Sequence, residues 1–331
     1  MLVLVTGGTG LLGNNIVRQL HELGHQCLAL VRQPPHRDVF AGVDVETVKG
    51  ELGDTRAVDE AVGRADAVIH SAGLIHIGWR HLDESMRVNR DGSANVARAA
   101  RRHGRRLVHV GTVDTFGVAS PGQSLDESHP VPSPGSRGGK VACSYVLSKR
   151  AGAEEVRREV ESGLDATIVH PGFMLGPWDW KPSSGRMAVE VGRAWRPICP
   201  SGGCSVCDVR DVANATINAL QTPESRGQEF ILAGENWSYR RLWGEIARRM
   251  GRRGPLARLG PTLRFAVGRA ADAVTKWTGN ESDLNSAALA ISSQFHYYSS
   301  RRAEAELDYR RRPIGETLND AVAWLRERHL P

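Results

Sequence analysis

The sequence contains little lysine and few aromatic residues, and these shortages argue against a nucleic-acid-binding protein. Only five of the 43 basic residues are lysine, and aromatic residues make up 6% of the chain. Such an arginine bias suggests GC-rich coding rather than selection for phosphate contacts. The basic runs at 101–106, 248–253 and 310–312 flank expected helix ends, where cations suit the helix dipole. A nucleic-acid surface would instead interleave cations with aromatic rings on one face, so we expect no nucleic-acid partner.

The sequence also lacks a long apolar run, a targeting segment and a clear cysteine framework. No apolar stretch is long enough to span a bilayer. The apolar start at 2–6 has no basic region before it and runs straight into glycines, so it predicts a strand rather than a signal peptide. Five cysteines fit a reducing compartment, and the single C-x-x-C of Cys204 and Cys207 has no second pair. We expect a cytoplasmic protein without a metal site.

Short apolar strands alternate with helical stretches over the first 170 residues. This alternation predicts a parallel sheet with helices on both faces, the doubly wound α/β (Rossmann) architecture. The expected strands are 2–6, 27–31, 45–49, 67–71, 106–111 and 166–170, with a first helix from about Leu11 to His21.

The pattern changes after Pro171, which suggests a second, smaller region interleaved with the first. Residues 176–187 are rich in Pro, Gly and Trp, residues 206–220 look like a return to the sheet followed by a helix, and 229–235 reads as a strand. From Tyr239 onward the chain is expected to be mainly helical, ending in a helix over 314–329. We therefore expect a dinucleotide-binding domain at 1–175, its sheet completed by 205–233, and a helix-rich, mainly substrate-binding region at 176–331.

A glycine-rich loop joins the first strand to the first helix. In TGGTGLLG (6–13), Gly7, Gly10 and Gly13 are spaced three apart. These glycines allow a tight turn, close approach of a pyrophosphate and close packing of helix on strand. The helix N-terminus then offers free N–H groups to the phosphates. The loop, with Leu11 and Leu12, predicts a dinucleotide site.

A second motif, YVLSK, places Tyr145 and Lys149 four residues apart, and therefore on one face of a helix. Together with the glycine loop it resembles the extended short-chain dehydrogenase/reductases, also called the NAD-dependent epimerase/dehydratase family. Six further segments match the family's pattern in order: KGELGD (49–54), HSAG (70–73), VNRDGSANV (88–96), LDESHPVP (125–132), PGFMLGP (171–177) and VRDVA (209–213).

The resemblance implies a catalytic role for four residues. Tyr145 would protonate the carbonyl oxygen as hydride arrives, and Lys149 would lower the tyrosine pKa and hold the nicotinamide ribose. Thr112 stands where the family usually has serine, five residues before Gly117, and its hydroxyl can still hydrogen-bond a substrate oxygen. Asn89 matches the family's helix-kinking asparagine, which would position Lys149; it can equally be an interior residue that satisfies local backbone.

The resemblance also implies further cofactor contacts. Glu51 stands where relatives have an aspartate that contacts the adenine amine, and Asp54 is expected to cap the following helix instead. The remaining expected contacts are Leu52, the backbone of Ser71, Ala72 and Gly73, and the segment around the nicotinamide, namely Pro171, Phe173 and Met174.

The end of the second strand predicts which cofactor is preferred. NAD-dependent members place an acidic side chain there to bind the ribose hydroxyls. Here Arg32 occupies this neighbourhood and no acidic residue occurs before Asp38. Because a guanidinium suits a phosphate, we expect NADP(H) to be preferred, with Arg37 as a second cation and NAD(H) as the other option.

Two reactions fit the resemblance. The first is NADP(H)-dependent reduction of a ketone or aldehyde, or oxidation of the alcohol, because segments 176–186, 232–236 and 308–313 look like the dihydroflavonol-reductase-like branch and bacterial hopanoid-associated epimerases. The alternative is an NAD-dependent nucleotide-sugar epimerase or dehydratase. A non-catalytic cofactor sensor is a third hypothesis, which the presence of both Tyr145 and Lys149 disfavours.

The substrate side of the sequence leaves several hypotheses open. Residues in segments that face the substrate in this family are either pocket or core residues here: His76, Trp79, Trp178, Trp180, Lys181, Arg186 and Trp195. The amphipathic stretch 263–279 is either a packed helix or a contact with a membrane surface near an apolar substrate. A homodimer is also among the arrangements that the sequence leaves open.

Overall fold

A computed structural model describes residues 1–329 and shows a seven-stranded, wholly parallel sheet. The order is β10-β6-β5-β4-β1-β2-β3, so the chain reverses direction across the sheet between β1 and β4. This confirms the predicted doubly wound fold. The strands are β1 (Leu2–Thr6), β2 (Gln26–Val31), β3 (Val45–Lys49), β4 (Ala67–His70), β5 (Arg106–Val110), β6 (Ala166–Pro171) and β10 (Glu229–Leu232).

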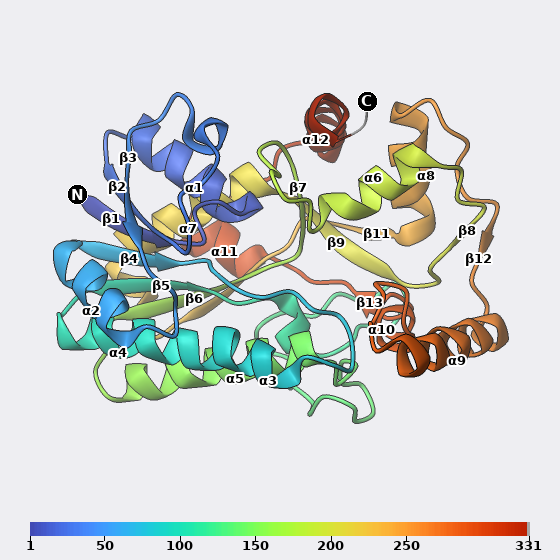
Figure 1. The fold of residues 1–331 in the computed structure, drawn as a ribbon, viewed down its shortest axis with the longest axis horizontal. Helices are drawn as coiled ribbons and strands as arrows, with labels where there is room; N and C mark the ends of the chain where they lie inside the picture. Colours follow the sequence, from blue (N-terminus) through green and yellow to red (C-terminus); the bar gives the residue numbers. More distant parts are fainter. Residues whose placement is uncertain (330–331) are drawn as a thin grey trace.

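Helices cover both faces of this sheet (Figure 1). On one face the core includes Ile16, Val212 and Leu307, from or beside α1 (Leu11–Glu22), α7 (Val209–Gln221) and α11 (Arg301–Glu306). On the other face it includes Val58 and Val156, and the helices are α2 (Thr55–Arg64), α4 (Gly92–Arg102) and α5 (Ser144–Glu161). The strands are therefore buried from both sides, which explains their continuous apolar runs.

The chain also forms a second, smaller sheet, which takes a strand that we expected in the large sheet. The strand within 206–220 does not return to the large sheet; β9 (Gly203–Asp208) pairs with β7 (Phe173–Leu175), β11 (Glu235–Ser238) and β13 (Phe295–His296). Only β10 from the segment 205–233 joins the large sheet. Glycine makes this second pairing possible, because a Cβ on Gly234 would lie 1.8 Å from the carbonyl oxygen of Val206.

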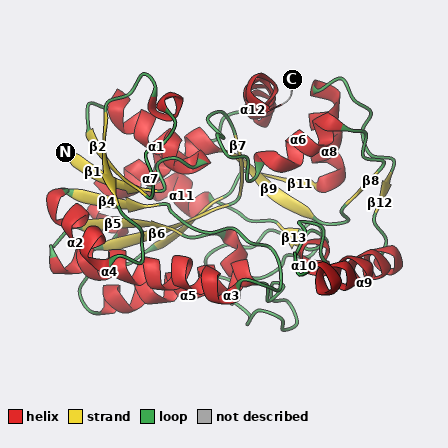
Figure 2. Ribbon diagram, in the orientation of Figure 1, coloured by secondary structure: helices red, strands yellow, loops and turns green. Residues whose placement is uncertain are grey.

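The rest of the chain is mainly helical, as predicted (Figure 2). A third core cluster joins the second sheet to α6 (Gly185–Arg193), α8 (Tyr239–Arg249) and α12 (Ile314–His329). A two-stranded ribbon of β8 (Ile198–Cys199) and β12 (Ala257–Arg258) leads to α9 (Pro261–Thr278) and α10 (Ser286–Ile291), while the short α3 (Leu82–Ser85) precedes a π-helical segment at Met86–Asp91. Within residues 1–329, none of the helices is long and apolar enough to cross a membrane.

Candidate active site

The glycine loop after β1 adopts a conformation that only glycine fits. Gly7 has a φ of 74°, and its carbonyl oxygen accepts a hydrogen bond of 2.9 Å from the Gly10 N–H. A Cβ on Gly13 would lie 2.1 Å from the same oxygen, so α1 packs directly on the loop. Leu11 and Leu12 are buried and anchor the first turn of α1. The loop and the helix N-terminus therefore form the phosphate cradle expected for a dinucleotide.

The loop after β4 lies against this cradle. Ser71 donates a 2.8 Å hydrogen bond from its hydroxyl to the Thr6 carbonyl, and the Ala72 N–H reaches the Thr6 hydroxyl at 3.3 Å. A Cβ on Gly7 would lie 2.7 Å from the Ala72 nitrogen. Because the strand order reverses between β1 and β4, Ser71, Ala72 and Gly73 lie at the crevice where doubly wound folds bind ligands.

Arg32 is the first residue after β2, and its side chain is exposed. Among residues 1–329 no carboxylate forms an ion pair with it. Arg37 lies in a 3-10 helix (Arg37–Phe40), is 92% exposed and has Asp38 at 3.6 Å. Asp38 also faces His36 and Arg328. The two predicted cations thus differ: Arg32 is available to an anion, whereas Arg37 has an acidic neighbour.

The residues after β3 mainly contact the neighbouring helices α2 and α4. Glu51 is exposed, whereas Leu52 packs against α4 at Gly92, and its carbonyl accepts a 2.9 Å hydrogen bond from Asn95. Asp54 caps α2 by accepting hydrogen bonds from the two backbone N–H groups of Arg56 and Ala57, as predicted.

Tyr145 and Lys149 lie in the first turns of α5, facing the end of β5. Lys149 Nζ donates a 2.8 Å hydrogen bond to the carbonyl of Val110, and burial lowers the pKa of its ammonium to about 8. The pKa of Tyr145 is raised above its ordinary value, first by burial and then by the negative charge of Asp114, while a hydrogen bond with Thr112 lowers it. The expected depression of the tyrosine pKa by Lys149 is thus not found, because the ammonium is directed to Val110.

Thr112 occupies the turn directly after β5, where the serine of related enzymes was expected. Its hydroxyl accepts a 3.2 Å hydrogen bond from the Asp114 N–H and thereby caps the 3-10 turn Val113–Thr115. Its carbonyl accepts a 2.8 Å bond from the Thr115 hydroxyl. The turn is therefore fixed on both sides and holds the Thr112 side chain beside Tyr145.

Asn89 lies in the π-helical segment, which agrees with a helix-kinking role. Its side-chain amide exchanges hydrogen bonds of 2.8 and 2.9 Å with the backbone of Leu74 and donates a further 2.9 Å bond to the Ser148 hydroxyl. The Asn89 oxygen and the Lys149 ammonium both lie near Gly73. Asn89 therefore holds the loop after β4 onto α5, one residue before Lys149.

Sequence reasoning missed a buried cluster next to this site: Asp114, Lys140 and His296. Asp114 Oδ1 lies 2.8 Å from His296 Nδ1 and 3.3 Å from Lys140 Nζ, and the Lys140 side chain is only 1% exposed. Burial lowers the pKa of Lys140 to about 8, and the interactions of Asp114 with Lys140 and His296 outweigh burial and hold the pKa of Asp114 well below its usual range. The only local signal was an acidic residue two positions after Thr112.

The segment after β6 leads from the large sheet into the second one. Pro171 ends β6, and Phe173 and Met174 lie on β7, half-buried. Phe173 packs against the core of the second region, whereas Met174 packs against the core beneath the large sheet. This segment therefore connects the cofactor side of the molecule with the second region.

The tryptophans expected near the substrate divide into packed and exposed groups. The rings of Trp178 and Trp180 lie 4.7 and 5.0 Å from that of Trp324 on α12, and the guanidinium of Arg18 lies 3.4 Å from the Trp178 ring centre. These two tryptophans join α12 to the rest of the molecule. Trp195 is exposed and bonds to the Gly254 carbonyl.

Of the other residues expected near the substrate, His76, Trp79 and Arg186 contact residues 281–286, between α9 and the start of α10. His76 Nε2 lies 2.8 Å from a carboxylate oxygen of Glu281, and the Trp79 indole donates a 2.7 Å bond to the hydroxyl of Ser286. Arg186 pairs with Asp283, and Lys181 is exposed.

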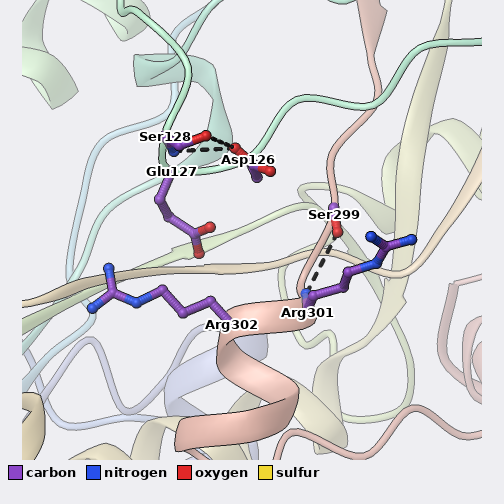
Figure 3. A pocket seen from close by; sticks show the side chains of 6 residues that line it. All are labelled: Asp126, Glu127, Ser128, Ser299, Arg301 and Arg302. Carbon is purple, nitrogen blue, oxygen red and sulfur yellow. Dashed lines mark hydrogen bonds between the residues drawn. The ribbon is translucent and has the colours of Figure 1, made fainter.

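Two surface cavities lie away from the tyrosine. One of about 330 Å³ is lined by residues of the 126–128 and 299–302 segments, where Figure 3 shows Asp126 bonded to Ser128 and Ser299 bonded to Arg301. The other, of about 570 Å³, is lined by parts of β9 and residues 309–314. Neither is lined by Tyr145, Lys149 or Thr112, so neither is a candidate for the reaction site.

The geometry brings a phosphate cradle, a buried tyrosine, a buried lysine and a threonine hydroxyl to one edge of the sheet. A phenol beside a hydroxyl can donate a proton to a carbonyl oxygen or accept one from an alcohol. Such a set suits hydride exchange between a nicotinamide and a carbonyl carbon.

Several proteins of known sequence are similar to this chain. A putative dihydroflavonol 4-reductase of Synechocystis sp. is 30% identical over 97% of this chain and 93% of its own length. Sterol demethylase protein B of Methylococcus capsulatus is 28% identical over 99% of both chains. A ceramide reductase of Caulobacter vibrioides is 36% identical over 54% of this chain and 48% of its own length.

A solved structure has a similar fold. The crystal structure of gox2253 matches with a TM-score of 0.85 and 30% identity, over 99% of each chain. Residues 3–234 match the family model described as the NAD-dependent epimerase/dehydratase family. The chain therefore belongs to the NAD-dependent epimerase/dehydratase family and is an NAD(P)-dependent enzyme of the extended short-chain dehydrogenase/reductase type.

Proposed function

We propose that the enzyme uses NADP(H) to reduce a ketone or aldehyde, or to oxidise the corresponding alcohol, with Tyr145 as the acid–base group. The observation that carries the proposal is the pairing of this tyrosine with Thr112, next to a glycine loop whose tight packing leaves no room for a Cβ at Gly7 or Gly13. Cofactor binding is assigned to residues 1–175 together with β10, and substrate binding mainly to residues 176–331.

The proposed mechanism divides the work among four side chains. NADPH, when bound, supplies the hydride. Tyr145 donates its phenolic proton to the substrate oxygen, and the Thr112 hydroxyl orients that oxygen. Burial keeps Tyr145 protonated before the reaction because it raises the pKa of the phenol. Lys149 contributes its positive charge at the cofactor ribose, and Asn89 fixes the loop of Gly73 beside it.

The preference for NADP(H) rests on Arg32. Its exposed guanidinium follows β2 directly, and among the described residues it has no carboxylate partner. A charge-assisted hydrogen bond to a phosphate contributes roughly 1.5–3 kcal/mol, which corresponds to about tenfold to a hundredfold in affinity. The 2′-phosphate of NADP(H) would supply this interaction, whereas the ribose hydroxyl of NAD(H) would not.

The names of the relatives support an apolar substrate. Two of them refer to a sterol and a ceramide, which are largely apolar molecules with hydroxyl groups. The alternative, a nucleotide-sugar epimerase or dehydratase, would need a site for the substrate diphosphate and a retained NAD. The five free, buried cysteines support our further proposal of a cytoplasmic location.

Dissociation constants for NADPH and NADH, measured for the wild type, Arg32→Ala and Arg37→Ala, test the cofactor assignment. We expect tighter binding of NADPH by the wild type, a loss of most of that preference in Arg32→Ala, and a smaller effect in the matched control Arg37→Ala, whose side chain already faces Asp38. Equal constants for the wild type, or tighter NADH, would overturn the assignment. A panel of apolar ketones run beside nucleotide sugars would then decide the reaction.

A further inference from the structure

Helix α9 presents a large apolar surface to solvent. Its side chains of Leu263, Phe265, Val274 and Trp277 are 47%, 69%, 57% and 90% exposed. Figure 1 places the helix at the end of the molecule opposite β1 to β3. A side chain as large as tryptophan is rarely left this open in a water-soluble protein without a partner.

The opposite side of α9 is fixed to α10, so the apolar side cannot turn inward. Gly268 and Thr275 are buried, and a Cβ on Gly268 would lie 3.0 Å from Cβ of Ser286. Asp272 accepts a 3.1 Å hydrogen bond from the Ser286 N–H at the start of α10. The packing of α9 on α10 therefore keeps the apolar side of α9 in solvent.

The charges around the exposed side are almost all positive. Residues 252–278 contain six basic residues and one acidic residue, Asp272, which faces α10. On α9 itself Arg269 and Lys276 are exposed, and within residues 1–329 neither has an ion-pair partner. Arg269 and Lys276 are seven residues apart and therefore share one side of the helix, next to the side of Leu263, Val274 and Trp277. A helix that lies in a lipid headgroup layer has such neighbouring basic and apolar sides.

We propose that α9 docks the enzyme on an anionic membrane surface, with Trp277, Leu263 and Val274 inserted among the lipids and Arg269 and Lys276 at the phosphates. The cations match the sign of anionic lipid headgroups, and the exposed tryptophan suits the boundary between headgroups and acyl chains. A surface contact is the relevant kind, because no described helix can span a bilayer.

A chain of contacts connects this helix with the active site. Glu281, three residues after α9 ends, accepts a 2.9 Å hydrogen bond from the Trp79 N–H and pairs with His76 at 2.8 Å. The carbonyl of His76 in turn accepts a 3.2 Å bond from the Tyr145 N–H. Docking through α9 would therefore hold the loop 76–80 and the catalytic helix near the lipid layer. An apolar substrate could then reach the active site from the lipid layer. That consequence rests on the proposed function, whereas docking itself does not.

Flotation of the full chain with vesicles tests the proposal. We expect the wild type to float with vesicles of phosphatidylglycerol and phosphatidylcholine at low salt, and much less with phosphatidylcholine alone or at high salt. The variant L263S/W277S should lose at least about tenfold in vesicle partitioning, and R269Q/K276Q about fivefold for each cation removed. Leu23→Ser, at the end of α1, and Arg56→Gln, on α2, are controls at exposed residues. Figure 1 shows α1 and α2 away from α9, so both variants should float like the wild type.

Three outcomes would overturn the proposal: no flotation of the folded wild type with anionic vesicles, equal flotation of the α9 variants, or a concentration-dependent dimer that L263S/W277S abolishes. The last result would mean that a second copy covers α9. Turnover of a small water-soluble carbonyl compound, measured in parallel, separates this proposal from the proposed function. Unchanged turnover in variants that no longer float supports docking. If the wild type turns over the compound but never floats, the proposed reductase function is retained and the proposed membrane docking is refuted.

Discussion

Replacing Asp114 by asparagine should destabilise the protein in a way that depends on pH. The Asp114 carboxylate is 2.8 Å from His296 Nδ1 and 3.3 Å from the ammonium of Lys140, which is almost wholly buried. Asparagine has nearly the same shape but carries no charge. The substitution therefore leaves a buried ammonium without its counter-charge.

The expected cost follows from the ionisation of Lys140. Removing one partner of a buried ion pair costs about 3–5 kcal/mol. Because the pKa of Lys140 is already lowered to about 8, the lysine can give up its proton instead, which places the loss near the lower end, at about 3 kcal/mol at pH 7. Above pH 8 Lys140 is neutral in the folded wild type as well, so the destabilisation should shrink as pH rises through this value.

Urea unfolding of the wild type and Asp114→Asn at pH 7 and pH 9, followed by tryptophan fluorescence, measures both effects. The single variant Lys140→Met should also be destabilised, and D114N/K140M should regain part of the loss, because the double variant contains no unpaired charge. Equal stability of wild type and Asp114→Asn at pH 7, or a difference that is the same at both pH values, would refute the reasoning.

Three further predictions concern the glycine loop, the ion pair of Glu229 and the proposed role of Lys149. Gly13→Ala should lower both thermal stability and NADPH affinity, because its added Cβ would lie 2.1 Å from the Gly7 oxygen. Gly10→Ala should keep the fold, because its added Cβ would lie 3.4 Å from the same oxygen. Equal melting temperatures of the two variants would contradict this prediction. Hydrogen bonds and charges from His170 and Arg157 outweigh burial and lower the pKa of Glu229 from 4.5 to about 2. The ionised Glu229 therefore adds roughly 3 kcal/mol to the free energy of unfolding above pH 4.5, and this contribution is lost as pH falls towards 2. In an acid titration, Glu229→Gln should lose less stability between these pH values than the wild type. Since burial lowers the pKa of Lys149 to about 8, kcat/KM for carbonyl reduction should fall as pH rises through about 8, and a flat profile from pH 7 to 9 would count against a charged Lys149.

Features coded over short stretches could be predicted from the sequence. The β1–loop–α1 unit follows from glycines three apart after an apolar strand, and the pairing of Tyr145 with Lys149 follows from helical spacing. The alternation of strands and helices was enough to give the parallel sheet, because strands buried on both faces have continuous apolar runs.

Features that depend on distant parts of the chain could not be predicted. Lys140 and His296 are 156 positions apart, and two long-range pairings, β13 with β9 and Ala119 with Phe295, bring His296 beside Asp114. The same long-range pairing explains why the strand before α7 joined the second sheet. The direction of the Tyr145 pKa also escaped prediction, since it depends on burial and on the Asp114 carboxylate.

Substitution of Tyr145 by phenylalanine tests the central claim most directly, with NADPH oxidation and NADPH affinity measured on the same preparation. Phenylalanine keeps the ring on α5 and removes only the hydroxyl beside Thr112. General acid catalysis contributes roughly a hundredfold to ten-thousandfold, so turnover of the best carbonyl substrate should fall within that range or further, while the dissociation constant for NADPH stays within about twofold. Turnover that stays within a few-fold of the wild type would contradict the account, because the proton would then come from another group.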